Sequence, residues 1–234
     1  MANEWKTSIS SSGEEAVIRG EKLEQVMDMD FADTIWLLLK GNKPTEKESE
    51  LFNTILSSSI DHGVGNPSTV SARTVQSGGN DMNTSVAGGI LSLGDAHGGA
   101  IEECMQILQS QKTAEEIVEE YLENGDKIPG IGHKVYDDVD PRAQKMLQKA
   151  EKLGLSADHV KKMKEIKQVF SEKKVNLVMN VDGAIAAVMS DLGWEPELGK
   201  GFFIIARTPG IVAHVREEMD EPDFRREKGE YVGE

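Results

Sequence analysis

Apolar residues recur every three or four positions along most of the chain, and this period predicts amphipathic helices. Four segments show the spacing, at residues 44–60, 112–125, 140–154 and 156–170. Two further segments, residues 176–193 and 201–219, are apolar nearly all round. That pattern is typical of helices buried in a core or in a subunit interface.

Polar residues mark where several of these helices begin. Thr45 with Glu48 and Thr113 with Glu116 have the spacing of capping boxes, in which each residue bonds the backbone N–H of the other. Asp140 precedes a proline and is expected to cap the helix that starts there. The chain therefore predicts helices whose ends are encoded locally.

The pattern departs from helix at the two ends of the chain. Residues 4–20 alternate in part around a serine-glycine run, which predicts a short β-hairpin. Residues 220–234 are polar and predict an extended tail. The fold expected from the whole pattern is all-α with a possible N-terminal hairpin.

Net charge narrows the choice of partner. The chain has 234 residues, a length that suits one large domain or two small ones. Its formal charge of −15 argues against binding to nucleic acid. Residues 127–174 depart from this balance, with 12 Lys and Arg against 7 Asp and Glu. This basic segment either seats an anionic ligand or is simply a solvated helix face.

The chain shows no sign of a membrane or disulfide-rich protein. No opening apolar run resembles a signal peptide, and no stretch reaches the ~18 apolar residues of a membrane span. We therefore expect a cytoplasmic protein. Cys104 is the only cysteine, which excludes a disulfide framework and a thiolate zinc site, and its helical spacing predicts a buried side chain.

Three of the five histidines lie next to glycine: His62, His97 and His133. Glycine lets the backbone and a ligand approach closely, so a neighbouring histidine is often presented to a ligand, although a turn histidine with no role is also common. His159, in the basic segment, and His214, in an apolar one, are interpreted as structural.

Asp182 and Arg207 stand within apolar segments. A buried carboxylate is paired, caps a helix or is kept for its reactivity, and a helix N-cap at Asp182 is as good an interpretation as a reactive group. Arg207 needs an anionic partner, either another side chain or a substrate carboxylate.

Several other chemistries lack their motifs. No histidine pair has the spacing of the HExxH metal motif, no GxSxG nucleophile elbow is present, and the glycines near His133 do not follow an apolar strand as in a dinucleotide-binding loop. What remains is a set of His and Asp acid–base groups with arginine anchors, beside a glycine-rich basic segment.

Four blocks of the chain together resemble, in order and spacing, the signature blocks of the citrate synthase family. They are SLGDAHGGAIE (92–102), IPGIGHKVYDDVDPRA (128–143), NLVMNVDGAIAAV (176–188) and IARTPGIVAHVREE (205–218). The likeness extends through residues 30–48 and 60–74, so it covers nearly the whole chain. Within the family, the blocks are most similar to stand-alone citryl-CoA lyases and to the citryl-CoA lyase module of ATP-citrate lyase.

The resemblance implies that the substrate is a coenzyme A thioester, with citryl-CoA cleaved to acetyl-CoA and oxaloacetate by a retro-Claisen step that needs no metal and no redox cofactor. It gives three residues catalytic roles: His133 takes the hydroxyl proton, His97 donates to the thioester oxygen and Asp182 protonates carbon. An alternative activity is citrate synthase, which also hydrolyses the thioester. A third is a non-autonomous CoA-binding subunit that works with a citryl-CoA synthetase.

The resemblance also implies binding residues. Those expected to bind the substrate carboxylates are His62, Arg142, Arg207 and, from the partner subunit, Arg226, with Arg225 as its alternative. Those expected to bind CoA are Lys127, Pro129, Gly130, Ile131, Gly132, Lys134, Lys173 and Lys174. Gly130 and Gly132 would let CoA lie against bare backbone.

The architecture implied by the resemblance has two helical domains. Residues 1–98 and 205–234 would form a large dimerisation domain, and residues 99–204 a small CoA-binding domain. A homodimer or higher oligomer would share its active sites.

Overall fold

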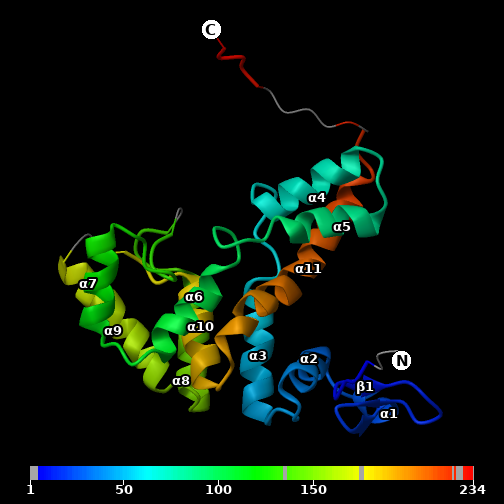
Figure 1. Cartoon of the computed structure of the whole chain (residues 1–234), viewed down its shortest axis with the longest axis horizontal. Coiled ribbons are helices and arrows are strands. Elements are labelled where there is room, and N and C mark those ends of the chain that lie inside the picture. The colour runs from blue at the N-terminus through cyan, green and yellow to red at the C-terminus, as the bar shows by residue number, and fades with distance from the viewer. Residues whose placement is uncertain (1–4, 134–135, 174–176, 223, 225–228, 234) are drawn as a thin grey trace.

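The computed structural model describes residues 5–133, 136–173, 177–222, 224 and 229–233. The described chain is mostly helical, as predicted, with one small sheet (Figure 1). The helices are α1 Leu23–Met27, α2 Phe31–Lys40, α3 Glu46–Ser58, α4 Pro67–Ser77, α5 Met82–Leu91, α6 Ala100–Gln109, α7 Ala114–Asn124, α8 Pro141–Leu153, α9 Asp158–Lys173, α10 Val181–Asp191, the 3₁₀ turn η1 Pro196–Leu198, and α11 Gly199–Glu218.

The helix starts that the sequence encodes locally are confirmed. Thr45 and Thr113 form the predicted capping boxes at α3 and α7. Asp140 caps α8 by accepting a hydrogen bond from the backbone N–H of Arg142, 3.0 Å away. The helix predicted at residues 156–170 begins at Asp158 as α9. Asp191, at the end of α10, accepts hydrogen bonds from the backbone N–H groups of Ala157, His159 and Val160 at this start.

The predicted N-terminal hairpin is present and continues into a third strand. The antiparallel order is β1 Ser10–Ser11, β2 Val17–Ile18 and β3 Glu21–Lys22. Between β2 and β3, Arg19 and Gly20 both have positive φ, at 50° and 83°. This is the left-handed geometry that a two-residue hairpin turn requires.

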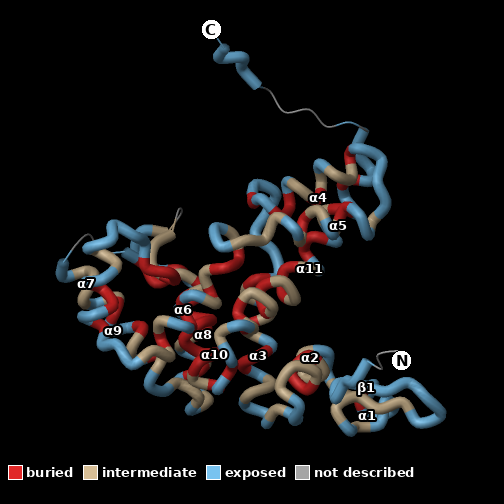
Figure 2. Tube along the Cα trace, in the orientation of Figure 1, coloured by how far each residue is buried: buried red, intermediate tan, exposed pale blue. Residues whose placement is uncertain are grey.

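A single apolar core runs through α2, α3 and α6–α10 and continues into the start of α11 (Figure 2). Helix α10 is buried on nearly all sides, as its apolar composition predicted. Cys104 lies in the same core, as predicted, and burial raises the pKa of its thiol. The core therefore packs around the helix that carries Asp182 on nearly all sides.

Helices α4, α5 and the second half of α11 form an arm with a separate, much smaller apolar cluster of Ala72, Ile211 and Val215 (Figure 1). The arm exposes apolar side chains, among them Val70, Leu91 and Val212. No helix in the described part of the chain is long and apolar enough to cross a membrane. The division into two domains at residues 98 and 205 stays a prediction.

Candidate active site

Polar side chains from distant parts of the sequence converge on one cavity of about 180 Å³. It lies where the loops before α4, α6 and α8 meet the first turn of α10 and the middle of α11. The predicted residues that line it are His62, His97, His133, Arg142, Asp182 and Arg207. The fold therefore brings together every described residue predicted to act in catalysis or to bind the substrate carboxylates.

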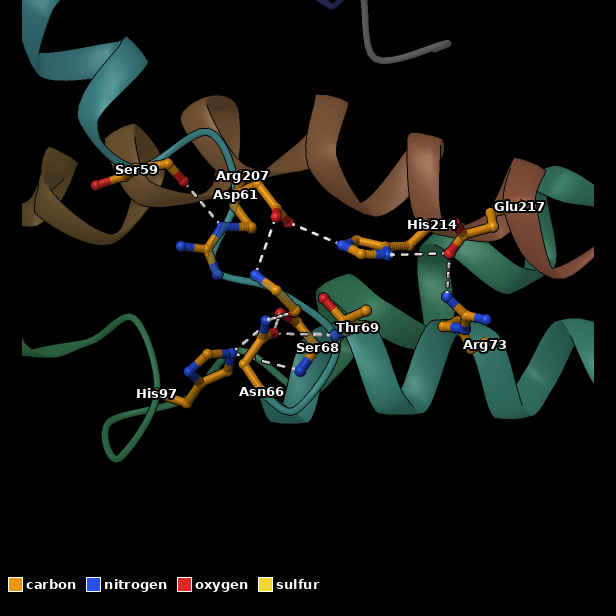
Figure 3. Close-up of polar contacts among 11 residues, drawn as sticks. Ser59, Asp61, Asn66, Ser68, Thr69, Arg73, His97, Arg207, His214 and Glu217 are labelled. Atoms are coloured by element: carbon orange, nitrogen blue, oxygen red, sulfur yellow. Dashed lines mark hydrogen bonds and ion pairs between the residues drawn. The ribbon is translucent and has the colours of Figure 1, made fainter. Parts of the chain in front are cut away.

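His97 is presented by a tight turn. The backbone groups of Gly94 and His97 exchange two hydrogen bonds of 2.9 Å. His97 Nε2 lies 3.4 Å from the backbone N of Ser68 and 3.0 Å from its Oγ (Figure 3). Because the backbone N–H can only donate, this contact favours the tautomer with its proton on Nδ1. Burial, together with the nearby charges of Arg207 and His62, lowers the pKa of His97 and keeps it neutral at pH 7.

His133 and Arg142 lie side by side. Nη2 of Arg142 is 3.2 Å from Nε2 of His133, and the backbone N–H of Tyr136 donates to Nδ1 of His133 over 3.1 Å. Asp140 holds the guanidinium of Arg142 through both carboxylate oxygens. Burial alone would raise the pKa of Asp140, but its hydrogen bonds and ion pair with Arg142 outweigh burial and lower it.

Asp182 lies in the first turn of α10, and the N-cap of that helix is Asn180. The alternative that Asp182 is the N-cap is therefore wrong. Its Oδ1 is buried and has no hydrogen-bond partner within the described residues. Burial raises the pKa of Asp182, and the charges of Arg142 and Arg207 offset this only in part. Such a carboxyl group keeps its proton more readily than an exposed one and can give it to a ligand.

Arg207 is buried, with 3% of its surface exposed. Its Nε donates to the carbonyl oxygen of Ser59 over 2.8 Å (Figure 3). Its guanidinium lies 4.8 Å from the centre of the Phe203 ring. Its Nη1 has no hydrogen-bond partner in the part of the chain that the structure describes. A buried cation with an unused donor, facing the cavity, is suited to an anionic ligand.

His62 lines the same cavity as these arginines and His133. Its ring centre is 6.4 Å from that of His133, and the two rings are nearly perpendicular. Burial and the charges of Arg142 and Arg207 lower the pKa of His62. The cavity thus combines imidazoles, one proton-holding carboxyl group and two arginines, which suits proton transfer on a carboxylate substrate.

A second cavity of about 340 Å³ adjoins the first, because His133 lines both. It is more apolar, and it is lined by Asp126, Lys127, Ile128, Ile131, Gly132, His133, Phe170 and Leu177. Three residues predicted to bind CoA are among these. Phe170 and Leu177 were not predicted, since Phe170 continues the apolar stripe of α9 and its sequence signal is that of a core residue.

The other residues predicted to bind CoA are placed differently. Pro129 and Gly130 are buried and do not line the second cavity. A Cβ on Gly130 would come within 2.5 Å of the Gly183 Cα, so glycine is needed there for backbone packing, whereas a Cβ on Gly132 would meet only the Leu177 side chain, at 3.9 Å. Lys173 is exposed and pairs with Glu119 over 2.7 Å. Four predicted residues lie outside the described ones: Lys134, Lys174, Arg225 and Arg226.

Two histidines were predicted to be structural. His159 pairs with Asp191 over 2.9 Å at the start of α9, away from both cavities. His214 also lies outside the cavity walls and contacts Asp61. Among the described residues, no group of three or more His, Cys, Asp or Glu side chains is placed to hold a metal ion.

Comparison of the sequence with known families gives one match over most of its length. The family model described as "Citrate synthase, C-terminal domain" matches residues 8–227. A curated relative, the citrate synthase of Haloferax volcanii, is 32% identical over 88% of this chain and 56% of its own length. The chain thus spans little more than half of that relative.

Solved structures with the same fold include two lyases. The citryl-CoA lyase of Hydrogenobacter thermophilus superposes with a TM-score of 0.92 at 44% identity, covering 98% of this chain and 95% of its own. The ATP citrate lyase of Methanothrix soehngenii, solved with citrate and coenzyme A, superposes with a TM-score of 0.88 at 26% identity. That match covers 100% of this chain and 42% of the other.

Proposed function

Because the chain belongs to the citrate synthase family, we propose that it is a citryl-CoA lyase, which cleaves citryl-CoA to acetyl-CoA and oxaloacetate. The observation that carries the proposal is the meeting of His97, His133 and Asp182 at one cavity. The cleavage needs a base, an enolate-stabilising donor and an acid around one substrate, and these three groups can supply them.

The carboxylates of the citryl group would face the cationic side of the cavity. Arg207 offers its unused Nη1, and Arg142 offers a guanidinium that Asp140 already orients. Two planar guanidinium groups can bind carboxylates in fixed directions, which sets the tertiary hydroxyl of the substrate at a defined place. His62, which lines the same cavity, would add a further polar contact.

The reaction would begin at His133, which takes the proton of the tertiary hydroxyl. The C–O bond then becomes a carbonyl, the carbon–carbon bond breaks, and its electron pair forms the enolate of acetyl-CoA. Neutral His97, with its proton on Nδ1, would donate to the enolate oxygen, a contact typically worth ~10²–10³ in rate. Asp182, whose raised pKa favours the protonated form, would give its proton to the terminal carbon.

The CoA chain would leave this cavity past His133 into the second one. Ile131, Phe170 and Leu177 give that cavity apolar walls, and Gly132 leaves its backbone open to a ligand. Lys127, at its edge, is placed to attract a phosphate group. The shared wall at His133 would put the thioester next to the acid–base groups.

A two-fold dimer is part of the proposal. The arm of α4, α5 and α11 has only a small apolar cluster of its own and exposes Val70, Leu91 and Val212. A second copy packed on the arm would cover these side chains and bring a neighbouring tail, with Arg226, toward the site.

Citrate synthase is the second candidate, because curated relatives such as that of H. volcanii carry this name. Synthase shares the carbon–carbon step and additionally hydrolyses the thioester. A subunit that depends on a citryl-CoA synthetase is the third.

An assay of products separates the three. The purified chain is incubated with citryl-CoA, and oxaloacetate and free citrate are measured separately. Oxaloacetate with acetyl-CoA supports lyase. Citrate and CoA formed from acetyl-CoA plus oxaloacetate support synthase. A chain that is inactive alone on citryl-CoA, but active with a synthetase added, supports the subunit.

A further inference from the structure

One face of α11 follows the loop that carries His62. Arg207 Nε donates to the carbonyl oxygen of Ser59, and a Cβ on Gly210 would lie only 2.3 Å from the carbonyl oxygen of Ile60. One turn further, His214 Nε2 lies 3.0 Å from Oδ1 of Asp61 (Figure 3). Residues three and four apart share a helix face, so α11 contacts three consecutive loop residues in register.

Asp61 fixes the backbone next to it. Its Oδ2 accepts a hydrogen bond from the backbone N–H of Gly63, the residue after His62, over 2.9 Å. Burial would raise the pKa of Asp61, but backbone hydrogen bonding and His214 outweigh it and lower the pKa, so the group is a carboxylate. Asp61 therefore sets the direction in which His62 leaves the chain.

His214 is itself held from the far side. Its Nδ1 lies 3.9 Å from Glu217, which pairs with Arg73 on α4 (Figure 3). Arg73 Nε also binds Glu218 over 2.6 Å. The contacts run from the loop through α11 to α4. Neither Asp61 nor His214 lines the substrate cavity.

We propose that His214 is a positioning residue: through Asp61 it holds His62 in the direction that binds the substrate. The proposal rests on the proposed function, which places the substrate carboxylates against His62. The proposal gives His214 a part in the reaction. The apolar residues that surround His214 in the sequence do not indicate such a role. Without the His214 contact, the Asp61 carboxylate would turn toward solvent, and the backbone N–H of Gly63, next to His62, would lose its fixed partner.

The geometry provides a matched set of variants. Glutamine reaches about as far as the Nε2 of histidine, whereas asparagine ends near the position of Nδ1. His214→Gln should therefore keep the bond to Asp61, and His214→Asn and His214→Ala should lose it. A role confined to packing would not favour glutamine over asparagine in this way.

Binding of oxaloacetate by calorimetry is the first measurement. A hydrogen bond to a carboxylate that is lost typically costs about tenfold or more in the equilibrium it supports. We expect His214→Ala and His214→Asn to raise the oxaloacetate Kd ~10-fold, and His214→Gln to stay within about threefold of the unchanged chain. In a His62→Ala background, His214→Ala should have no further effect, because the residue it acts through is gone.

The NMR resonance of the His62 ring is the second measurement and needs no ligand. It should shift in His214→Asn and not in His214→Gln. An unshifted resonance and unchanged Kd in His214→Asn, or a full additional loss in the His62→Ala background, would overturn the positioning role. Failure of the unchanged chain to bind oxaloacetate while the His62 resonance responds as expected would count against the proposed function instead.

Discussion

Asp140 and Arg142 are joined by two side-chain hydrogen bonds, from Nη2 to Oδ2 over 2.8 Å and from Nε to Oδ1 over 3.1 Å. Oδ2 of the same buried carboxylate also accepts from the backbone N–H of Val181 over 3.0 Å, at the start of α10. One carboxylate therefore fixes both an arginine that lines the cavity and the helix turn that carries Asp182.

The first prediction concerns this carboxylate. Asp140→Ala leaves Arg142 and the start of α10 without their shared partner, so we expect the free energy of unfolding to fall by ~3 kcal/mol and the KM for citryl-CoA to rise. Urea denaturation and steady-state kinetics measure the two effects. Asp81→Ala is the control, because Asp81 stands at the N-cap of α5 and makes no side-chain cap bond. Equal losses in the two variants would contradict the role of Asp140.

Asp182→Asn separates catalysis from stability. We expect turnover to fall at least ~10²-fold, because the proton donor is lost. Because the pKa of Asp182 is raised, the folded state binds this proton more tightly than the unfolded state does. The native carboxyl group therefore destabilises the fold as pH rises above 3.8, the ordinary pKa of an aspartate side chain. The variant should therefore be as stable as the unchanged chain or more so at neutral pH.

Unfolding curves at several pH values check the second half of this prediction. The stability advantage of Asp182→Asn should grow from about pH 4 upward and then level off once the folded group has ionised. An unchanged turnover would remove Asp182 from the mechanism. A variant less stable at pH 7 than at pH 4, relative to the unchanged chain, would mean that burial does not raise the pKa.

Two glycines with similar positive φ values allow a comparison. Gly125 and Gly130 have φ values of 73° and 82°, but a Cβ on Gly125 meets open space and one on Gly130 meets Gly183. Gly125→Ala should cost only the left-handed strain, ~1–2 kcal/mol. Gly130→Ala should cost at least ~1–3 kcal/mol more and should reduce turnover, because it pushes the loop of His133 away from α10. Urea denaturation gives both losses, and equal values would rule out the close approach.

Phe170→Ala tests the second cavity. Loss of most of this side chain removes ~1.5 kcal/mol of apolar contact, which corresponds to about a tenfold higher Kd for CoA. Val169→Ala is the control, because Val169, on the same helix, also packs against the apolar core but does not line the cavity. Calorimetry with CoA measures the affinity. A similar Kd for the two variants would place CoA elsewhere.

Leu91→Arg tests the dimer. Leu91 is 85% exposed on the arm, and a second copy covering it would have to bury the new charge. We expect the dimer Kd to rise at least ~10-fold by sedimentation equilibrium. Phe31→Arg changes a side chain that is 79% exposed on α2 and should have no effect. If only Phe31→Arg dissociates the dimer, the partner binds the other face.

The sequence predicted features whose cause is local. The capping boxes at Thr45 and Thr113 depend on residues three positions apart, so they can be read without tertiary structure. His62, His97 and His133 were singled out because glycine neighbours show that the chain turns there, and the citrate synthase resemblance assigned their roles. The structure brings these three histidines to one cavity, and their roles stay predictions.

What the sequence did not predict depends on contacts between distant segments. The start of α9 is set by Asp191, more than 30 residues away, and the need for glycine at 130 comes from Gly183. Phe170 has the spacing of a core residue, and only the fold shows that it faces a cavity. His214 was interpreted as structural because its neighbours are apolar, and its contact with Asp61 cannot be inferred from spacing.

The register of α11 against loop residues 59–61 limits where insertions and deletions can occur in α11. An α-helix turns by ~100° per residue, so a single residue inserted between Arg207 and His214 would swing the imidazole well away from Asp61 while the guanidinium kept its place. Substitutions on the outer face of α11 leave that spacing intact. Insertions and deletions between Arg207 and His214 should therefore be tolerated far less than changes of residue type, in any related chain that keeps the activity.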